Sequence, residues 1–237
     1  MSSSQPAANL GSAPGHLLGA VGAITIGQSP RRDITDEISP LLGPGLRIIE
    51  AGALDGLSND EIAAMAPADD DHTLVTVLRD GREVLLGRRH VLPRVQACVD
   101  RLQDHVDLIL MLCTGTFPRF RSRRMLLYPE QLLFQTARAV IGRGHVGVLT
   151  PSPRQIADQE RRWHEVAAAV TVRAFSPYAA GDLEAACRDF VTAGVDVVVL
   201  DCLGYTVALK REVRARTGRP VLLARTVLAR AAAELGG

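Results

Sequence analysis

The chain has 237 residues, a formal net charge of +1 and a composition that is 47% hydrophobic and 22% charged. This composition is typical of a globular protein with a buried core, whereas the near-neutral charge and the 4% aromatic content argue against nucleic-acid binding. No apolar run approaches the roughly 20 residues that cross a bilayer, so we expect no membrane partner and a cytoplasmic protein.

Local signals in the first half predict an N-terminal tail followed by alternating strands and helices. Residues 1–19 are rich in Ser, Gly, Pro and Ala and lack the apolar stretch of a secretory signal, so we expect a disordered tail. Ser58 and Glu61 have the spacing of a helix capping box, and Asp80-Gly81 between two apolar runs indicates a hairpin. The predicted elements are a strand at 20–27, a helix at 30–42, a strand at 46–54, a helix at 58–66, a β-hairpin at about 73–88, a helix at 90–103 and a strand at 106–113.

The second half repeats this alternation more regularly. Its predicted elements are a helix at 129–141, a strand at 145–150, a helix at 153–168, a strand at 168–175, a helix at 180–193, a strand at 195–201, a helix at 206–216, a strand at 220–224 and a C-terminal helix. Apolar strands that alternate with helices favour an α/β fold in which helices cover both faces of a parallel sheet.

Two pairs of segments recur in the same order in the two halves. "VGAIT" (21–25) matches "VGVLT" (146–150), and "VDLILMLCTGT" (106–116) matches "VDVVVLDCLGY" (195–205), with Cys and Gly at the same places. Internal similarity of this kind predicts two homologous lobes. We place them at 20–128, including the hairpin, and at 129–237, with the last helix free to pack on the first lobe.

Cys113 and Cys202 stand at the ends of the matched strands. Ligands of open α/β sheets bind beyond the carboxyl ends of the strands, so two facing lobes would bring both thiols to one cleft. A thiol titrates near pH 8.5, and a pair can remove a carbon-bound proton on one face of a substrate and return one on the other. Cys98 and Cys187 lie on apolar helix faces and are predicted to belong to the core. The cysteines and histidines show no metal-binding spacing, so no metal site is predicted.

Four segments carry a resemblance to a known family. "TIGQSPRRD" (25–33), "GALDGLS" (52–58), "LILMLCTGTF" (108–117) and "LDCLGY" (200–205), in this order, resemble the AroM family. That family is similar to the aspartate/glutamate/hydantoin racemase superfamily, which also includes arylmalonate decarboxylases and maleate cis–trans isomerases. The resemblance implies two pseudo-symmetric Rossmann-like lobes with a cleft between them, and catalysis by paired cysteines, one per lobe, without a cofactor. The turns here, Cys113-Thr114-Gly115 and Asp201-Cys202-Leu203, differ from the usual Cys-Asn-Thr and Gly-Cys-Thr of racemases.

Further residues at or near the strand ends are candidates for substrate binding: Ser29, Arg31, Arg32, Thr114, Gly115, Thr116, Asp201, Gly204 and Tyr205. The Thr and Gly residues form turns whose N–H groups can hold a carboxylate, although turn formation alone also explains the glycines. The two arginines can clamp a carboxylate or form a solvated helix start, and Ser29 can cap or bind. Asp201 can cap the next helix or act on the substrate and on its neighbour's pKa, and Tyr205 can line the cleft or pack on the sheet. The basic loop Arg119–Arg124 is predicted to be a surface loop rather than an anion-binding lid.

The sequence therefore predicts a cofactor-independent racemase or isomerase of a small carboxylate, with Cys113 and Cys202 as its acid/base pair. Two alternatives stay open: a decarboxylase or cis–trans isomerase of the same superfamily, and a non-catalytic metabolite-binding protein on the same fold. The expected partner is the small carboxylate, with a homodimer left open, and neither nucleic acid nor membrane is expected.

Overall fold

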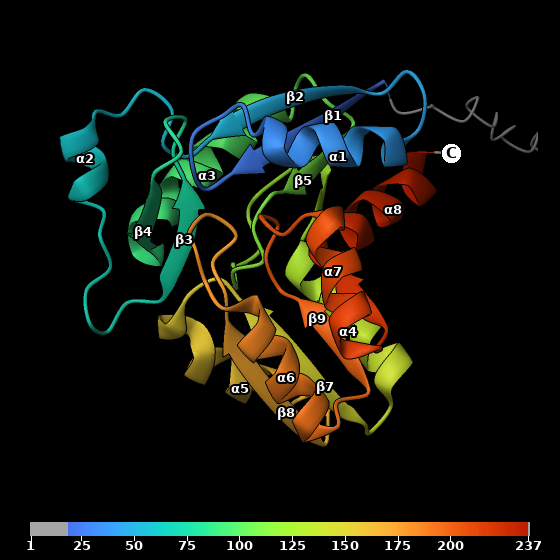
Figure 1. Ribbon diagram of the computed structural model, residues 1–237. Helices are drawn as coiled ribbons and strands as arrows, with labels where there is room; N and C mark the ends of the chain where they lie inside the picture. Colours follow the sequence, from blue (N-terminus) through green and yellow to red (C-terminus); the bar gives the residue numbers. More distant parts are fainter. Residues whose placement is uncertain (1–18, 237) are drawn as a thin grey trace, which may run out of the picture.

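Two four-stranded parallel sheets organise the protein in the computed structural model, which describes residues 19–236 (Figure 1). The first sheet contains β1 (Ala20–Thr25), β2 (Arg47–Gly52), β5 (Leu108–Met111) and β6 (Met125–Leu127) in the order β2-β1-β5-β6. The second contains β7 (His145–Thr150), β8 (Ala169–Ala174), β9 (Val197–Leu200) and β10 (Val221–Leu223) in the order β10-β9-β7-β8. We call the parts around these sheets lobe 1 and lobe 2. Apart from Gly19, the predicted tail lies outside the described residues.

The two sheets share one topology and one register. When strands are numbered within their own lobe, both sheets have the order 2-1-3-4. Val21 of β1 pairs with Leu108 of β5, and Val146 of β7 pairs with Val197 of β9. These are the positions that the sequence repeat aligns, so the repeat extends to the pairing of the central strands.

An aspartate explains why the Val-Asp pair recurs before each cysteine strand. Asp107 Oδ2 accepts a hydrogen bond from the backbone N–H of Gly19 at 2.8 Å, where β1 begins. Asp196 Oδ2 accepts one from the N–H of His145 at 2.7 Å, where β7 begins. Equivalent carboxylates, Asp107 and Asp196, therefore fix the start of β1 in lobe 1 and of β7 in lobe 2.

Helices cover the sheets, and a hairpin is inserted in lobe 1. The helices are α1 (Arg32–Leu42), α2 (Asn59–Ala63), α3 (Arg88–Leu102), α4 (Pro129–Ile141), α5 (Ile156–Trp163), α6 (Leu183–Ala193), α7 (Val207–Thr217) and α8 (Ala224–Gly236), with a 3₁₀ turn η1 (Pro153–Gln155) before α5. The hairpin pairs β3 (Thr73–Val77) with β4 (Glu83–Gly87). Ser58 and Glu61 form the predicted capping box of α2. Within residues 19–236, no helix combines the length and the apolar character that a membrane-spanning segment requires.

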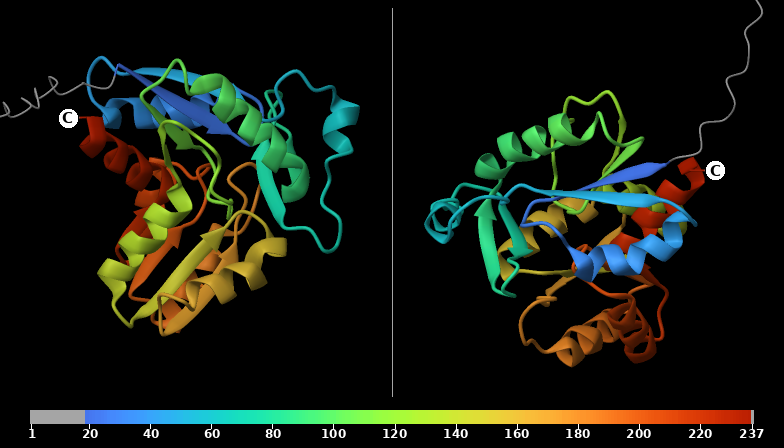
Figure 2. Two further views of the ribbon diagram at one scale, coloured as in Figure 1. Left: turned by 180° about the vertical axis from the view of Figure 1, so that it is seen from behind. Right: turned by 90° about the horizontal axis from the view of Figure 1, so that it is seen from above.

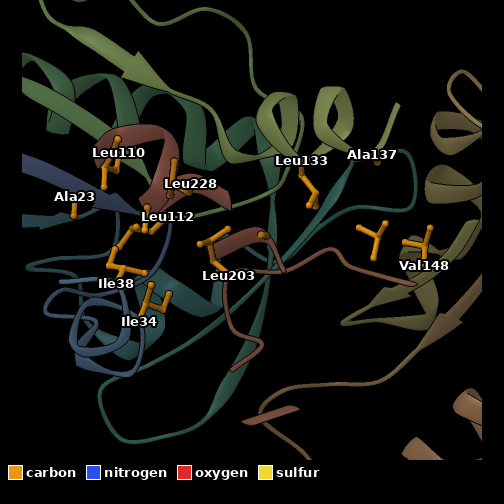
Figure 3. Packing of buried hydrophobic residues seen from close by; sticks show 14 of the residues in the cluster. Ala23, Ile34, Ile38, Leu110, Leu112, Leu133, Ala137, Val148, Leu203 and Leu228 are labelled. Atoms are coloured by element: carbon orange, nitrogen blue, oxygen red, sulfur yellow. The ribbon is translucent and has the colours of Figure 1, made fainter. Parts of the chain in front are cut away.

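An apolar cluster joins the two lobes. It combines side chains of β1 and β5 with side chains of β7 and β9, together with residues of α1, α4 and α8. Figure 3 shows Ile34 and Ile38 of α1 close to Leu203 and to Leu228 of α8. Helix α8 packs on both α1 and α4, so the last helix of the chain lies against lobe 1 (Figure 2). Each fully buried leucine or isoleucine here contributes about 1.5–3 kcal/mol to stability.

Apart from shifts of up to three residues in the bounds of other elements, the structure differs from the sequence prediction in two places. Strand β6 was not predicted, because its apolar run is only three residues long and directly follows a basic loop. The helix predicted at 153–168 is wrong in extent, since a 3₁₀ turn precedes α5 and α5 ends at Trp163. The apolar residues Val166 and Ala167 instead join the inter-lobe core just before β8.

Candidate active site

The carboxyl ends of both sheets border one cavity of about 470 Å³. Its wall comes from the turns after β5 and β9, from the hairpin strand β3 and from η1 and α5. The predicted site residues that line it are Arg31, Cys113, Thr114, Gly115, Thr116, Asp201, Cys202 and Gly204. The structure thus brings the two matched strand ends together, as expected for ligand sites of open α/β sheets.

The two cysteine turns have the same local geometry. Cys113 Sγ accepts a hydrogen bond from the backbone N–H of Gly115 at 3.4 Å. Cys202 Sγ accepts one from the backbone N–H of Gly204 at 3.3 Å. The Cys-x-Gly spacing of the repeat therefore places the glycine N–H against the cysteine sulfur in each turn. This hydrogen bond would stabilise a thiolate.

A hydrogen bond connects the two turns across the lobes. The hydroxyl of Thr114 donates to the carbonyl oxygen of Asp201 at 3.1 Å. Both cysteines line the same cavity, and a negative charge on Cys202 raises the pKa of Cys113. The site therefore holds two coupled thiols, one from each lobe.

Burial keeps both thiols protonated at neutral pH. Burial raises the pKa of Cys113 to about 12 and the pKa of Cys202 to about 11. The glycine N–H groups and the guanidinium of Arg31 act in the opposite direction on both pKa values, but burial outweighs them. The more readily ionised thiol is that of Cys202.

Asp201 is a buried ion-pair partner rather than a helix cap. Its Oδ2 accepts hydrogen bonds from Arg162 Nη2 at 2.8 Å and from Trp163 Nε1 at 3.1 Å, and its side chain is inaccessible to solvent. Helix α7 is capped by Thr206, whose hydroxyl accepts from the N–H of Leu209. The capping alternative for Asp201 is therefore wrong, and the carboxylate instead ties α5 to the end of β9.

Arg31 lies in the cavity wall with its guanidinium largely occupied. Its Nε and Nη2 donate to the carboxylate of Asp33 at 2.8 and 2.6 Å, and Nη2 also donates to the hydroxyl of Tyr178 at 3.0 Å. Arg31 thus lines the cavity, and the Nε and Nη2 edge that could clamp a carboxylate of the substrate already binds the carboxylate of Asp33. Its remaining effect on the site is electrostatic, through the thiol pKa values.

Three predicted site residues lie outside the cavity. Ser29 donates from its hydroxyl to Asp55 Oδ2 at 2.6 Å, and Arg32 is exposed at the start of α1. Tyr205 is fully buried and donates from its hydroxyl to the carbonyl of Phe175 at 2.7 Å, so it packs on the sheet. The cysteines predicted to be core, Cys98 and Cys187, are buried in α3 and α6, which confirms that prediction.

The basic loop after the first cysteine turn does not line the cavity. Arg123 pairs with Asp104, and the backbone N–H of Arg121 donates to Gln96 of α3 at 2.9 Å. Arg119 lies over the ring of Tyr128 at 5.1 Å. The loop is held on the surface of lobe 1, as the sequence indicated.

Several residues of the site carry no sequence signal that we could interpret. Tyr178 lies in the loop after β8, and its hydroxyl would meet a Cβ added at Gly204 at a distance of 2.4 Å, so only glycine fits beneath it. His72, Arg88 and Arg162 also line the cavity, from the hairpin segment and from α5. None of them follows a matched strand, and only the packing of hairpin and lobe 2 brings them to the site.

Comparisons with known proteins agree with this geometry. Unliganded arylmalonate decarboxylase superimposes with a TM-score of 0.57 at 18% identity, covering 92% of each chain. Allantoin racemase from Klebsiella pneumoniae gives a TM-score of 0.59 at 16% identity, covering 91% of this chain and 86% of that one. The maleate isomerase Iso from Pseudomonas putida S16 gives 0.56 at 16% identity, covering 89% of each chain. At such identities the likeness shows the fold.

No curated protein matches the sequence. Residues 21–236, nearly the whole chain, match the family described as AroM protein. The chain therefore belongs to the AroM protein family, and its two lobes have the fold of the aspartate/glutamate racemase, isomerase and decarboxylase structures.

Proposed function

We propose that the protein is a cofactor-independent racemase or isomerase of a small carboxylic acid, in which Cys113 and Cys202 transfer protons. The observation that carries the proposal is the pair of matched Cys-x-Gly turns, one from each lobe, that line one cavity and are joined by the Thr114–Asp201 hydrogen bond.

The proposed reaction uses one thiol as base and the other as acid. The thiolate of one cysteine takes the proton from the carbon next to the carboxylate, and the C–H electron pair is delocalised onto the carboxylate oxygens as an enediolate. The thiol of the other cysteine then donates its proton to the opposite face of the same carbon. The protein ends with the thiolate on the second cysteine, so the reverse reaction uses the same groups with exchanged roles.

The electrostatics of the site support a single ionised thiol at a time. A charge on Cys202 raises the pKa of Cys113, so the loss of one proton opposes the loss of the second. The lower pKa of Cys202 makes it the first base. Arg31 lowers both pKa values but only partly offsets burial, so the proposed reaction uses the small fraction of molecules in which Cys202 is a thiolate.

Loss of CO₂ from a malonate-type acid would give the same carbanion, which a thiol could protonate. This decarboxylase alternative needs no different residues. The binding-protein alternative differs, because it requires neither thiol to exchange a proton with the ligand.

Deuterium incorporation tests the proposal. In D₂O, the wild-type protein should exchange the α-proton of a cognate member of a panel of amino, hydroxy and aryl acids, as followed by NMR. Cys113→Ser and Cys202→Ser should abolish inversion, whereas Cys187→Ser, a buried cysteine of α6, serves as the matched control and should retain it. No exchange by the wild type across the panel would refute proton transfer and favour a binding protein.

A further inference from the structure

The basic side chains of the cavity wall differ in whether a carboxylate lies beside them. They are Arg31, Arg88, Arg161, Arg162 and His72. Arg31 pairs with Asp33, Arg162 pairs with Asp201, and both Arg161 and His72 contact Asp158. Among the described residues, no carboxylate lies within 4.0 Å of Arg88.

The guanidinium of Arg88 is fixed but not saturated. Arg88 is the first residue of α3, directly after the hairpin strand β4, and its backbone N–H donates to the carbonyl of His72 at 3.0 Å. Its Nη1 donates to the carbonyl oxygen of Thr116 at 3.1 Å. Within residues 19–236, its Nε and Nη2 groups donate to no protein acceptor, so one edge of the fork stays available.

We propose that Arg88 is the anion anchor of the cavity and binds a carboxylate of the ligand through this unused edge. The proposal rests on the proposed function in that the ligand is a small acid. It assigns the role that the sequence suggested for Arg31 to a residue of the inserted hairpin segment. A guanidinium fork matches a carboxylate in geometry as well as in charge.

The anchor lies within reach of the reacting groups. Thr116, which holds Arg88, is three residues after Cys113 in the same turn. Three residues span at most about 10–11 Å even when fully extended. A small acid whose carboxylate is held on Arg88 can therefore place the carbon next to that carboxylate near the thiols.

Other acidic groups do not occupy this edge. Glu165 also lines the cavity, but it forms no ion pair with Arg88. Arg88 borders a shallow surface hollow with Asp69, Asp70 and Asp71 as well. Asp71 Oδ2 lies 3.5 Å from Arg89 Nε and accepts no hydrogen bond from the described residues, and no Asp71 oxygen lies within 4.0 Å of Arg88.

His72 offers a spectroscopic report on the anchor. Burial lowers the pKa of His72, Asp158 raises it, and the charges of Arg88 and Arg162 lower it further. An anion bound to Arg88 would cancel part of that positive field. Binding should therefore raise the pKa of His72.

The test is a binding titration with succinate and with butyrate as carboxylate probes, followed by calorimetry and by NMR of the His72 ring. In the wild type we expect binding of at least one probe and an upward shift of the His72 pKa. Arg88→Gln should weaken this binding by about 10- to 100-fold, the range for one charge-assisted contact, and remove the shift, while Arg88→Lys should restore part of the affinity. Arg101→Gln, at an exposed position of the same helix outside the cavity wall, is the matched control and should bind as the wild type does.

The same experiment separates this inference from the proposed function. Cys113→Ser and Cys202→Ser should still bind the probe even though they cannot invert a substrate. Arg88→Gln that keeps its thermal stability and binds as tightly as the wild type would overturn the anchor, as would a wild type that binds neither probe or a His72 pKa that does not respond. A protein that binds through Arg88 but exchanges no α-proton would retain the anchor and refute the racemase.

Discussion

Titration of the two site thiols should reveal an unusually late ionisation of both, with Cys202 ahead of Cys113. With pKa values of about 11 and about 12, roughly 1 in 1,000 molecules carries a Cys202 thiolate at pH 8 and roughly 1 in 10,000 a Cys113 thiolate. An ordinary thiol would be about one quarter ionised at that pH. The cause is burial, which the glycine amides and Arg31 only partly offset.

The rate of iodoacetamide alkylation at each cysteine, measured by peptide mass spectrometry between pH 7 and 11, reports this directly because only the thiolate reacts. We expect the rate at Cys202 to increase about tenfold per pH unit over this range. Arg31→Gln should slow alkylation at both sites, because it removes a charge that lowers both pKa values, whereas the exposed neighbour in Arg32→Gln should leave the rates unchanged. A Cys202 that titrates at or below pH 8.5 in the folded, ligand-free protein would refute the reasoning.

Three further predictions concern stability and the shape of the site. Both thiols keep their protons to a higher pH in the folded than in the unfolded protein, so the free energy of unfolding should fall as the pH rises above 8.5. The expected fall is about 1.4 kcal/mol per pH unit for each thiol until about pH 11. In urea titrations, a variant with either cysteine replaced by alanine should show a shallower fall. Arg225→Met should lower the free energy of unfolding by about 3 kcal/mol in the same assay. The guanidinium of Arg225 joins α8 to α1 and to the second cysteine turn, and its loss leaves the carboxylate of Glu37 and a buried carbonyl without their partner. Arg230→Met, on the exposed face of α8, should be nearly neutral. Gly204→Ala should lower the free energy of unfolding by about 1–3 kcal/mol and displace Tyr178, whose hydroxyl lies 2.4 Å from the new Cβ; an unchanged melting temperature would contradict this.

The repeat made most of the fold predictable from the sequence. Two matched segments in the same order implied two lobes, and the structure adds that even the register of the central strands is shared. The helix at 129–141 and the strand at 145–150 have the predicted bounds, because a proline starts the helix and a glycine follows its last residue. Strand β6 was missed because it is stabilised by pairing with β5 rather than by its own pattern.

The candidate site was predictable only where it follows the strands. Cys113 and Cys202 could be predicted because each directly follows a buried parallel strand, and the strands of a parallel sheet end at one edge, where ligands bind. This argument needs only the sequence pattern of each lobe. Arg31 lies in the cavity wall, but its pairing with Asp33 was not predicted, because the sequence shows both residues and not the geometry between them. Tyr178 and Arg88 reach the cavity through contacts between segments that lie far apart in the chain. For example, 147 positions separate Arg31 from Tyr178, which it contacts, and no local sequence pattern encodes such a contact.

The central claim is that Cys113 and Cys202 exchange protons with opposite faces of the substrate carbon. The most direct test measures which enantiomer each cysteine variant still deuterates. For a chiral acid that the wild type racemises, each enantiomer is incubated in D₂O with Cys113→Ser or with Cys202→Ser, and deuterium at the α-carbon is followed by NMR. If each cysteine serves one face, each variant should retain exchange with a single enantiomer, and the retained enantiomer should differ between the two variants. If both variants lose exchange with the same enantiomer, or if either exchanges both at the wild-type rate, the two thiols are not an acid/base pair acting from opposite sides of the substrate.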